Sequence, residues 1–350
     1  MRPIIFALIA AILYGTTGTA QALGPDGASS LSVGSARIVI GGAALAIVAW
    51  LLSLHSRRTM RHLEPGHPIT DMLTLHIPNL SGPEPQLTKA ASARWRGWPT
   101  ITVGALAVIA YQPTFFLGMS VNGVAIGAVV AIGSGPIFTG VLEWALSRRF
   151  PGYGWLVATV VAIAGIALLS GANQSGVTDP AGLLLSLGAG ACYAFYALSA
   201  KKLLVDGWTP MGSVSILFGW SAVGALPILL LSDPSWLVSL DGLLMGLWLG
   251  IGTITIACLF LSYGLKALSA STVATLGLGE PLTATLLGVL VIHETLSGRA
   301  FLGLALVVSG LVLIGFLTAQ RRSRDRVEPQ PVASVGSKSG ADAHSDRDRE

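Results

Sequence analysis

A single carboxylate lies near the middle of a long apolar stretch of this sequence. Glu280 stands within residues 270–291, and the residue that follows it is Pro281. A carboxylate in such surroundings can take up a proton or bind a cationic group, because its charged form is poorly solvated there. Pro281 has no N–H group and disturbs the helical hydrogen bonds just before it, which can open the backbone to a ligand. The alternative is structural: a protonated Glu280 that hydrogen-bonds to a neighbouring Ser, Thr or backbone group.

A second charge, that of Arg37, lies about one third of the way into the apolar residues 31–54. Three roles are open to it. Its long arm can reach out to the polar edge of the apolar layer, it can pair with Glu280 or Asp241, or it can bind the carboxylate of a solute. Arg37 is nearer the end of its stretch than Glu280, which makes a direct pair between the two harder to form.

Polar and aromatic side chains at similar depth complete the set of candidates. Gln112 offers two donors and an acceptor, and it lies between Tyr111 and Pro113. Ordinary hydrogen bonding between helices is the other role for Gln112. Aromatic rings with hydroxyl groups suit organic ligands, although buried tyrosines also simply pack. Three further tyrosines occupy such mid-stretch positions, namely Tyr14, Tyr193 and Tyr196.

The composition indicates which elements hold these side chains. Hydrophobic residues make up 52% of the chain and charged residues 11%, against about 25% charged in soluble domains. The apolar runs reach helical lengths of roughly 30 Å, the thickness of the bilayer core. Cys192 and Cys258 lie inside such runs and are interpreted as small buried residues rather than a disulfide. The sequence predicts an all-α membrane protein with about ten spans, at 3–23, 31–54, 98–119, 122–146, 153–171, 181–200, 211–231, 241–264, 270–291 and 298–318.

The basic residues predict the orientation of these spans. With the N-terminus in the cytoplasm, nearly all of the 21 Lys and Arg residues fall on the cytoplasmic side, as the positive-inside rule requires. The polar, proline-containing residues 55–97 then form a cytoplasmic loop. Glu143 is expected at a cytoplasmic span end, reaching towards Arg148. An alternative for the N-terminus is a signal peptide, since Met1-Arg2 precedes an apolar run.

An internal repeat divides the chain into two sets of five spans. When residue 111 is aligned with residue 256, Pro136 falls on Pro281 and Gly165 on Gly310. An odd number of spans in each half makes the second half enter the membrane inverted relative to the first. Inverted repeats are typical of secondary transporters, whose binding site lies near the midplane where the halves meet.

These features resemble the drug/metabolite transporter superfamily, EamA type. The second half carries the resemblance, in Gly279-Glu280-Pro281, then His293-Glu294, then a glycine-rich last span. The first half keeps Pro136 but has Arg149 where the loop glutamate of the family would stand. The resemblance implies ten spans in two five-helix repeats, and an exporter of small metabolites, amino acids or drugs.

The sequence thus predicts a secondary active transporter, in the cell membrane, of a small organic metabolite, amino acid or drug-like solute. It would work by alternating access, with proton coupling through Glu280 as a hypothesis. We expect residues 1–171 to form the first repeat, 181–318 the second, and 319–350 a disordered cytoplasmic tail. The predicted substrate-binding or coupling residues are Glu280, Pro281, Arg37, Gln112, Tyr111, Tyr14, Tyr193, Tyr196 and Pro136.

Two other classes of function stay open at this point. A lipid-handling protein or membrane enzyme would need clustered polar residues, and loop 55–97 offers only widely spaced histidines. A membrane scaffold or sensor would signal through that loop or the tail. No nucleotide-binding, metalloprotease or nucleophile motif is found, so we expect no enzyme, no cofactor and no metal. The expected partners are a solute, membrane lipids and protons, with a homodimer as an option and no nucleic acid.

Overall fold

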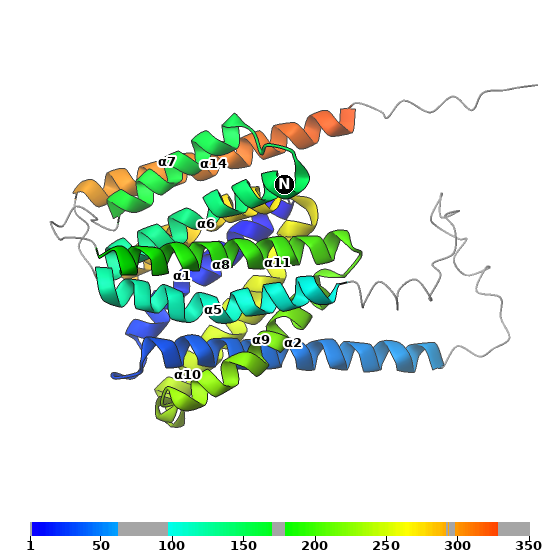
Figure 1. Cartoon of the computed structure of the whole chain (residues 1–350), viewed down its shortest axis with the longest axis vertical. Helices are drawn as coiled ribbons and strands as arrows, with labels where there is room; N and C mark the ends of the chain where they lie inside the picture. The colour runs from blue at the N-terminus through cyan, green and yellow to red at the C-terminus, as the bar shows by residue number, and fades with distance from the viewer. Residues whose placement is uncertain (1, 62–96, 170–178, 292, 294–297, 328–350) are drawn as a thin grey trace, which may run out of the picture.

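A computed structural model describes residues 2–61, 97–169, 179–291, 293 and 298–327 as a bundle of helices (Figure 1). No β-strand occurs in these ranges. The first half of the bundle consists of α1 (Arg2–Ala22), α2 (Ser30–Arg61), α5 (Trp98–Asn122), α6 (Val124–Ser147) and α7 (Tyr153–Leu169). The second half consists of α8 (Pro180–Val205), α9 (Pro210–Leu231), the short 3-10 helix η1 (Ser235–Val238), α10 (Leu240–Leu247), η2 (Trp248–Ile256), α11 (Ala257–Ala267), α12 (Ala270–Gly277), α13 (Gly279–Val291) and α14 (Gly298–Val327).

The expected membrane spans are confirmed. Within the described ranges, nine helical segments are long and apolar enough to cross a membrane, and α7 adds a shorter apolar helix of 17 residues. Two spans are not regular. The span 240–267 contains a π-helical stretch, η2, between α10 and α11, and the span 270–291 is interrupted at Leu278 between α12 and α13.

Two helices continue beyond their apolar stretches. α2 extends to Arg61 and α14 to Val327, so residues 55–61 and 319–327 are helical rather than loop or tail. Neither extension contains Gly or Pro, the residues that end helices. The remainder of the expected loop, 62–96, and of the expected tail, 328–350, lies outside the described residues.

Helix packing follows an inverted two-fold pattern. α2 packs along α9, and α7 packs along α14, so that equivalent helices of the two halves meet. The contact of α5 with α8 is mirrored by that of α1 with α11, and the contact of α6 with α8 by that of α1 with α13. Five spans in each half make α8 run opposite to α1 (Figure 1). The predicted fold of two inverted five-helix repeats is therefore confirmed.

Glycines allow the closest of these helix contacts. A Cβ atom at Gly165 of α7 would lie 2.7 Å from the carbonyl oxygen of Gly303 on α14, and one at Gly303 would lie equally close to the Gly165 carbonyl. At this point the two backbones touch directly, which is how small residues hold membrane helices together.

The helices connect at two opposite ends of the bundle. The end where α1 begins and α14 finishes is called the N-terminal end, and the opposite end is called the distal end (Figure 1). The connections α1–α2, α5–α6 and α9–η1 lie at the distal end, whereas α6–α7, α8–α9 and α11–α12 lie at the N-terminal end.

Candidate functional site

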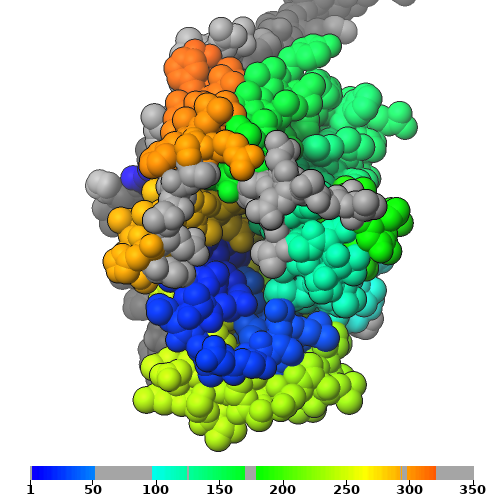
Figure 2. Space-filling model, turned by 90° about the vertical axis from the view of Figure 1, so that its left-hand side faces the viewer, coloured from blue at the N-terminus to red at the C-terminus, as the bar shows by residue number. Residues whose placement is uncertain are grey.

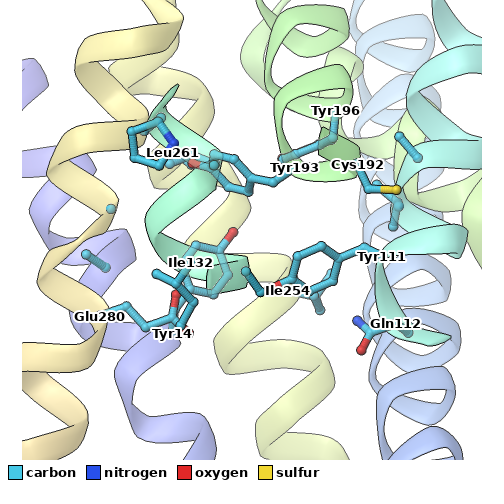
Figure 3. A pocket seen from close by; sticks show the side chains of 18 of the residues that line it. Tyr14, Tyr111, Gln112, Ile132, Cys192, Tyr193, Tyr196, Ile254, Leu261 and Glu280 are labelled. Carbon is cyan, nitrogen blue, oxygen red and sulfur yellow. The ribbon is translucent and has the colours of Figure 1, made fainter. Parts of the chain in front are cut away.

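A cavity lies where the two halves meet. It contains about 980 Å³ of space not filled by atoms, part of which is open solvent. All of the predicted site residues except Pro281 line it: Tyr14, Arg37, Tyr111, Gln112, Pro136, Tyr193, Tyr196 and Glu280. The structure thus brings residues from α1, α2, α5, α6, α8 and α13 around one space, as Figure 3 shows for most of them.

Glu280 stands at the helix interruption in the ninth span. α12 ends at Gly277 and α13 begins at Gly279, so Glu280 occupies the first turn of α13. The positive end of a helix dipole favours a carboxylate at that position. Pro281 lies behind it in the same turn and supplies no N–H, in keeping with a break at this place. No described residue forms a hydrogen bond or an ion pair with the Glu280 side chain.

Gly15 on α1 lets the two halves approach at Glu280. A Cβ atom at Gly15 would lie 2.7 Å from the backbone oxygen of Glu280 and 2.5 Å from Cβ of Thr283. Only a glycine fits at this contact. Nothing in the sequence singles out Gly15 except its position directly after Tyr14.

Arg37 faces the same cavity without a partner. Its Nε atom is buried and has no hydrogen-bond partner. An ion pair with Glu280 or with Asp241 is one of the three roles open to Arg37, and neither pair is present. Among the side chains that the structure describes, Lys202 and Asp206 form the only ion pair, at 3.0 Å. The acidic Glu280 and the basic Arg37 therefore both line the cavity but lie more than 4.0 Å apart.

The aromatic walls are held by specific contacts. The Tyr14 hydroxyl lies 3.0 Å from Sγ of Cys258, the ring of Tyr111 stacks on Phe115, and Tyr193 and Tyr196 meet edge to face. The hydroxyl of Tyr196 is buried without a hydrogen bond. Figure 3 shows the rings of Tyr14, Tyr111 and Tyr193 around one space, with Glu280 beside Tyr14. Cys258 is buried as expected, and its contact with Tyr14 is an addition that no sequence pattern indicated.

Gln112 sits between the cavity and α2. It is buried, and a Cβ atom at Gly34 would lie 2.5 Å from Oε1 of Gln112, so this glycine makes room for the amide. No described residue hydrogen-bonds to the amide. Its donors and its acceptor are available to a solute in the cavity.

The π-helix η2 also contributes to the wall of the cavity. Ile254 of η2 projects into the space (Figure 3). Thr255 donates from Oγ1 to the carbonyl oxygens of Gly41 and Gly250, which ties η2 to α2. π-Helical turns often occur at functional sites. The sequence does not predict this π-helix, because nothing in the composition of residues 248–256 distinguishes them from the α-helix on either side.

Side-chain hydrogen bonds fix the turn between α11 and α12 at the N-terminal end of the bundle. Glu143 of α6 accepts hydrogen bonds from the backbone N–H groups of Ala270, at 3.1 Å, and Ser271, at 2.9 Å. Nζ of Lys201 on α8 donates to the carbonyl oxygens of Leu265, at 2.6 Å, and Leu268, at 2.7 Å. These contacts, called the latch below, hold the turn between α11 and α12. The expectation that Glu143 reaches towards Arg148 is wrong, because free backbone N–H groups at a helix start bind a carboxylate well.

The distal end is hollowed instead. Figure 2 looks onto this end and shows a depression bordered by α1 and α2 in blue, α5 and α6 in blue-green, and α13 in yellow-orange. These are the helices that carry Tyr14, Arg37, Tyr111, Pro136 and Glu280.

A membrane enzyme that uses a metal ion would need a cluster of metal-binding side chains. No group of three His, Cys, Asp or Glu side chains within them could hold a metal ion. His62, His67 and His76 of the expected loop lie outside the described residues.

Comparisons with known proteins agree with this geometry. Residues 180–316 match the model of the EamA-like transporter family. The chain is 36% identical to "Uncharacterized transporter YwfM" of Bacillus subtilis (strain 168), over 92% of this chain and 96% of that protein. It is 29% identical to "Threonine/homoserine exporter RhtA" of Salmonella typhimurium (strain LT2), over 56% of this chain and 68% of that protein. A solved crystal structure with 20% identity shares the fold, with a TM-score of 0.67 over 91% of this chain and 98% of that one.

Proposed function

Because this chain belongs to the EamA-like transporter family, whose members are multi-pass membrane transporters, we propose that it is a secondary active exporter of a small organic solute. The observation that carries the proposal is the cavity between two inverted halves, with the partnerless carboxylate of Glu280 at its wall. Two inverted halves can exchange conformations, and each exchange moves the opening of a central site from one face of the membrane to the other.

The N-terminal end is placed in the cytoplasm in this proposal. Basic residues gather at that end, whereas acidic residues mark the distal connections, and the positive-inside rule assigns such an end to the cytoplasm. The described basic residues there include Arg2, Arg148, Arg149, Lys201, Lys202 and Lys266, and the distal acidic ones are Asp26, Asp179, Asp233 and Asp241.

The latch and the distal depression then describe an outward-facing state. On the cytoplasmic side Glu143 joins the two halves, and Lys201 holds the same α11–α12 turn within the second half; the depression of Figure 2 is the proposed access from outside. The inward-facing state arises when the α11–α12 turn separates from α6 and α8. A solute that binds one of the two states better shifts the protein towards that state.

Glu280 is the proposed coupling residue. An unneutralised charge near the middle of the membrane costs about 2.5–3.5 kcal/mol on insertion scales. A proton or a cationic group of the solute can each neutralise Glu280, and the two compete for the same oxygens. Solute leaving on the outer side is therefore replaced by a proton, which is released inside. The name of the RhtA relative supports both export and a solute the size of an amino acid.

Proteoliposomes that contain a pH-sensitive dye test this proposal. A panel of amino acids, threonine and homoserine included, and of organic amines is applied as a gradient. We expect at least one solute to drive proton movement through the wild-type protein, and Glu280→Gln to abolish the proton signal. Asp241→Asn, the same change at an exposed distal carboxylate, serves as the control and keeps the signal. Unchanged coupling in Glu280→Gln would refute the role of this residue.

A further inference from the structure

The cavity carries two opposite charges that do not satisfy each other. Arg37 comes from α2 in the first half, and Glu280 comes from α13 in the second half. Both line the cavity, and no ion pair joins them within 4.0 Å. Neither side chain has a hydrogen bond to a described residue, and Nε of Arg37 is fully buried. Buried charges of this kind are costly unless something pairs with them.

The chemistry of the two groups differs, and so do the ligands that they suit. A guanidinium group presents its donors in a planar fork that matches a carboxylate, whereas a carboxylate such as Glu280 suits an ammonium group. A solute with only an amine leaves Arg37 unpaired, and one with only a carboxylate leaves Glu280 unpaired. A zwitterion satisfies both at once.

The rest of the wall suits an uncharged, apolar body. The rings of Tyr14, Tyr111 and Tyr193 and the side chains of Ile132 and Ile254 face the same space (Figure 3). Aromatic rings bury much apolar surface while their hydroxyl groups remain available for hydrogen bonds.

We infer that the transported solute is a zwitterion of the amino-acid type with an apolar or aromatic body, held by its carboxylate at Arg37 and its ammonium at Glu280. This inference rests on the proposed function and narrows it. Arg37 becomes the residue that separates zwitterions from simple organic cations. Glu280 by itself would bind the ammonium group of a zwitterion or of a simple organic cation.

Matched series of compounds test the inference on the purified full-length protein. One series is phenylalanine, phenethylamine and 3-phenylpropionate, which share a body and differ in their charges. A second series is leucine, isoamylamine and 4-methylpentanoate. Binding is measured by the rise in thermal stability at increasing concentration, because a ligand that prefers the folded state raises it. We expect a zwitterion of at least one series to bind about tenfold or more tightly than its amine and its acid, as the loss of one charge-assisted contact implies.

Variants of Arg37 add a second readout. In Arg37→Gln, we expect the zwitterion to lose its advantage over the amine, while the affinity for the amine does not fall, because a like charge has been removed from the cavity. Arg37→Lys keeps the charge and recovers part of the advantage. The comparison within the wild-type protein needs no substitution, so a variant that fails to fold does not remove the test.

Other results overturn the inference. Equal binding of amine and zwitterion, or no binding by any zwitterion of either series, contradicts it. An Arg37→Gln variant that keeps the full preference for the zwitterion contradicts it as well. Proton movement driven by amines alone would contradict the zwitterion inference but remain consistent with the proposed exporter. A complete lack of coupled proton movement with any solute would contradict the proposed function itself.

Discussion

The carboxylate of Glu143 accepts a hydrogen bond of 2.9 Å from the backbone N–H of Ser271, and this bond joins the first half of the protein to the start of α12 in the second. Lys201 holds the preceding turn through its bond to Leu268, so both ends of the α11–α12 connection are fixed. Since α12 leads directly to Leu278 and Glu280, the latch holds the start of the segment that carries the proposed coupling residue.

Loss of the Glu143 carboxylate should favour opening at the N-terminal end. Glu143→Ala leaves two backbone N–H groups at the start of α12 without an acceptor, a loss of about 1 kcal/mol by comparison with helix caps. Glu143→Gln retains an acceptor oxygen and should have a smaller effect. Cross-linking of cysteine pairs placed across α6 and α12, measured in membranes, should become slower in Glu143→Ala than in Glu143→Gln. Equal rates in both variants and in the parent would contradict a closing role.

Cys192 should report access to the cavity. It lines the cavity, whereas Cys258 is buried against Tyr14, and these are the two cysteines of the chain. A small, membrane-impermeant thiol reagent added from the distal side should label Cys192 and spare Cys258. Mass spectrometry of the labelled protein identifies the site, and Cys192→Ser serves as the control. A bound solute should slow the reaction, and labelling confined to Cys258 would contradict the described cavity.

The close contact of α7 with α14 should be sensitive to a single methyl group. In Gly165→Ala, the new Cβ would meet the Gly303 carbonyl at 2.7 Å, and overpacking of this kind costs about 1–3 kcal/mol. Gly315→Ala on α14 adds the same methyl group where no atom lies within 4 Å. Thermal unfolding in detergent should show a lower midpoint for Gly165→Ala and little change for Gly315→Ala. Similar midpoints for the two variants would show that the helices can move apart freely.

A buried hydrogen-bond cluster should stabilise the contact between α7 and α12. Oγ1 of Thr275 accepts from Nε1 of Trp155 at 3.0 Å and lies 2.8 Å from Oγ1 of Thr159. Thr275→Val leaves these groups buried with fewer partners, at a cost of about 1–3 kcal/mol. Thr102→Val, at an exposed position whose hydroxyl bonds only to its own helix, is the control. The same unfolding assay should separate the two, and an equal response would argue against a stabilising cluster.

Several features of this protein follow from the order of its residues alone. The spans are set by the length and apolar character of local runs, which depend on no distant contact. The inverted repeat follows from the odd number of spans and from the match of Pro136 with Pro281. Glu280 and Arg37 stand out because a charge within an apolar run is rare.

Other features depend on the tertiary structure. Most helices here are apolar on nearly every side, so their sequences carry little information about which face turns inwards. Helix rotation and packing therefore decided that Glu143 bonds to α12 rather than to Arg148. They also decided that Arg37 stays apart from Glu280 and that Cys258 meets Tyr14. Each of these outcomes concerns residues from different halves of the chain, and only the assembled bundle decides whether such residues come within bonding distance.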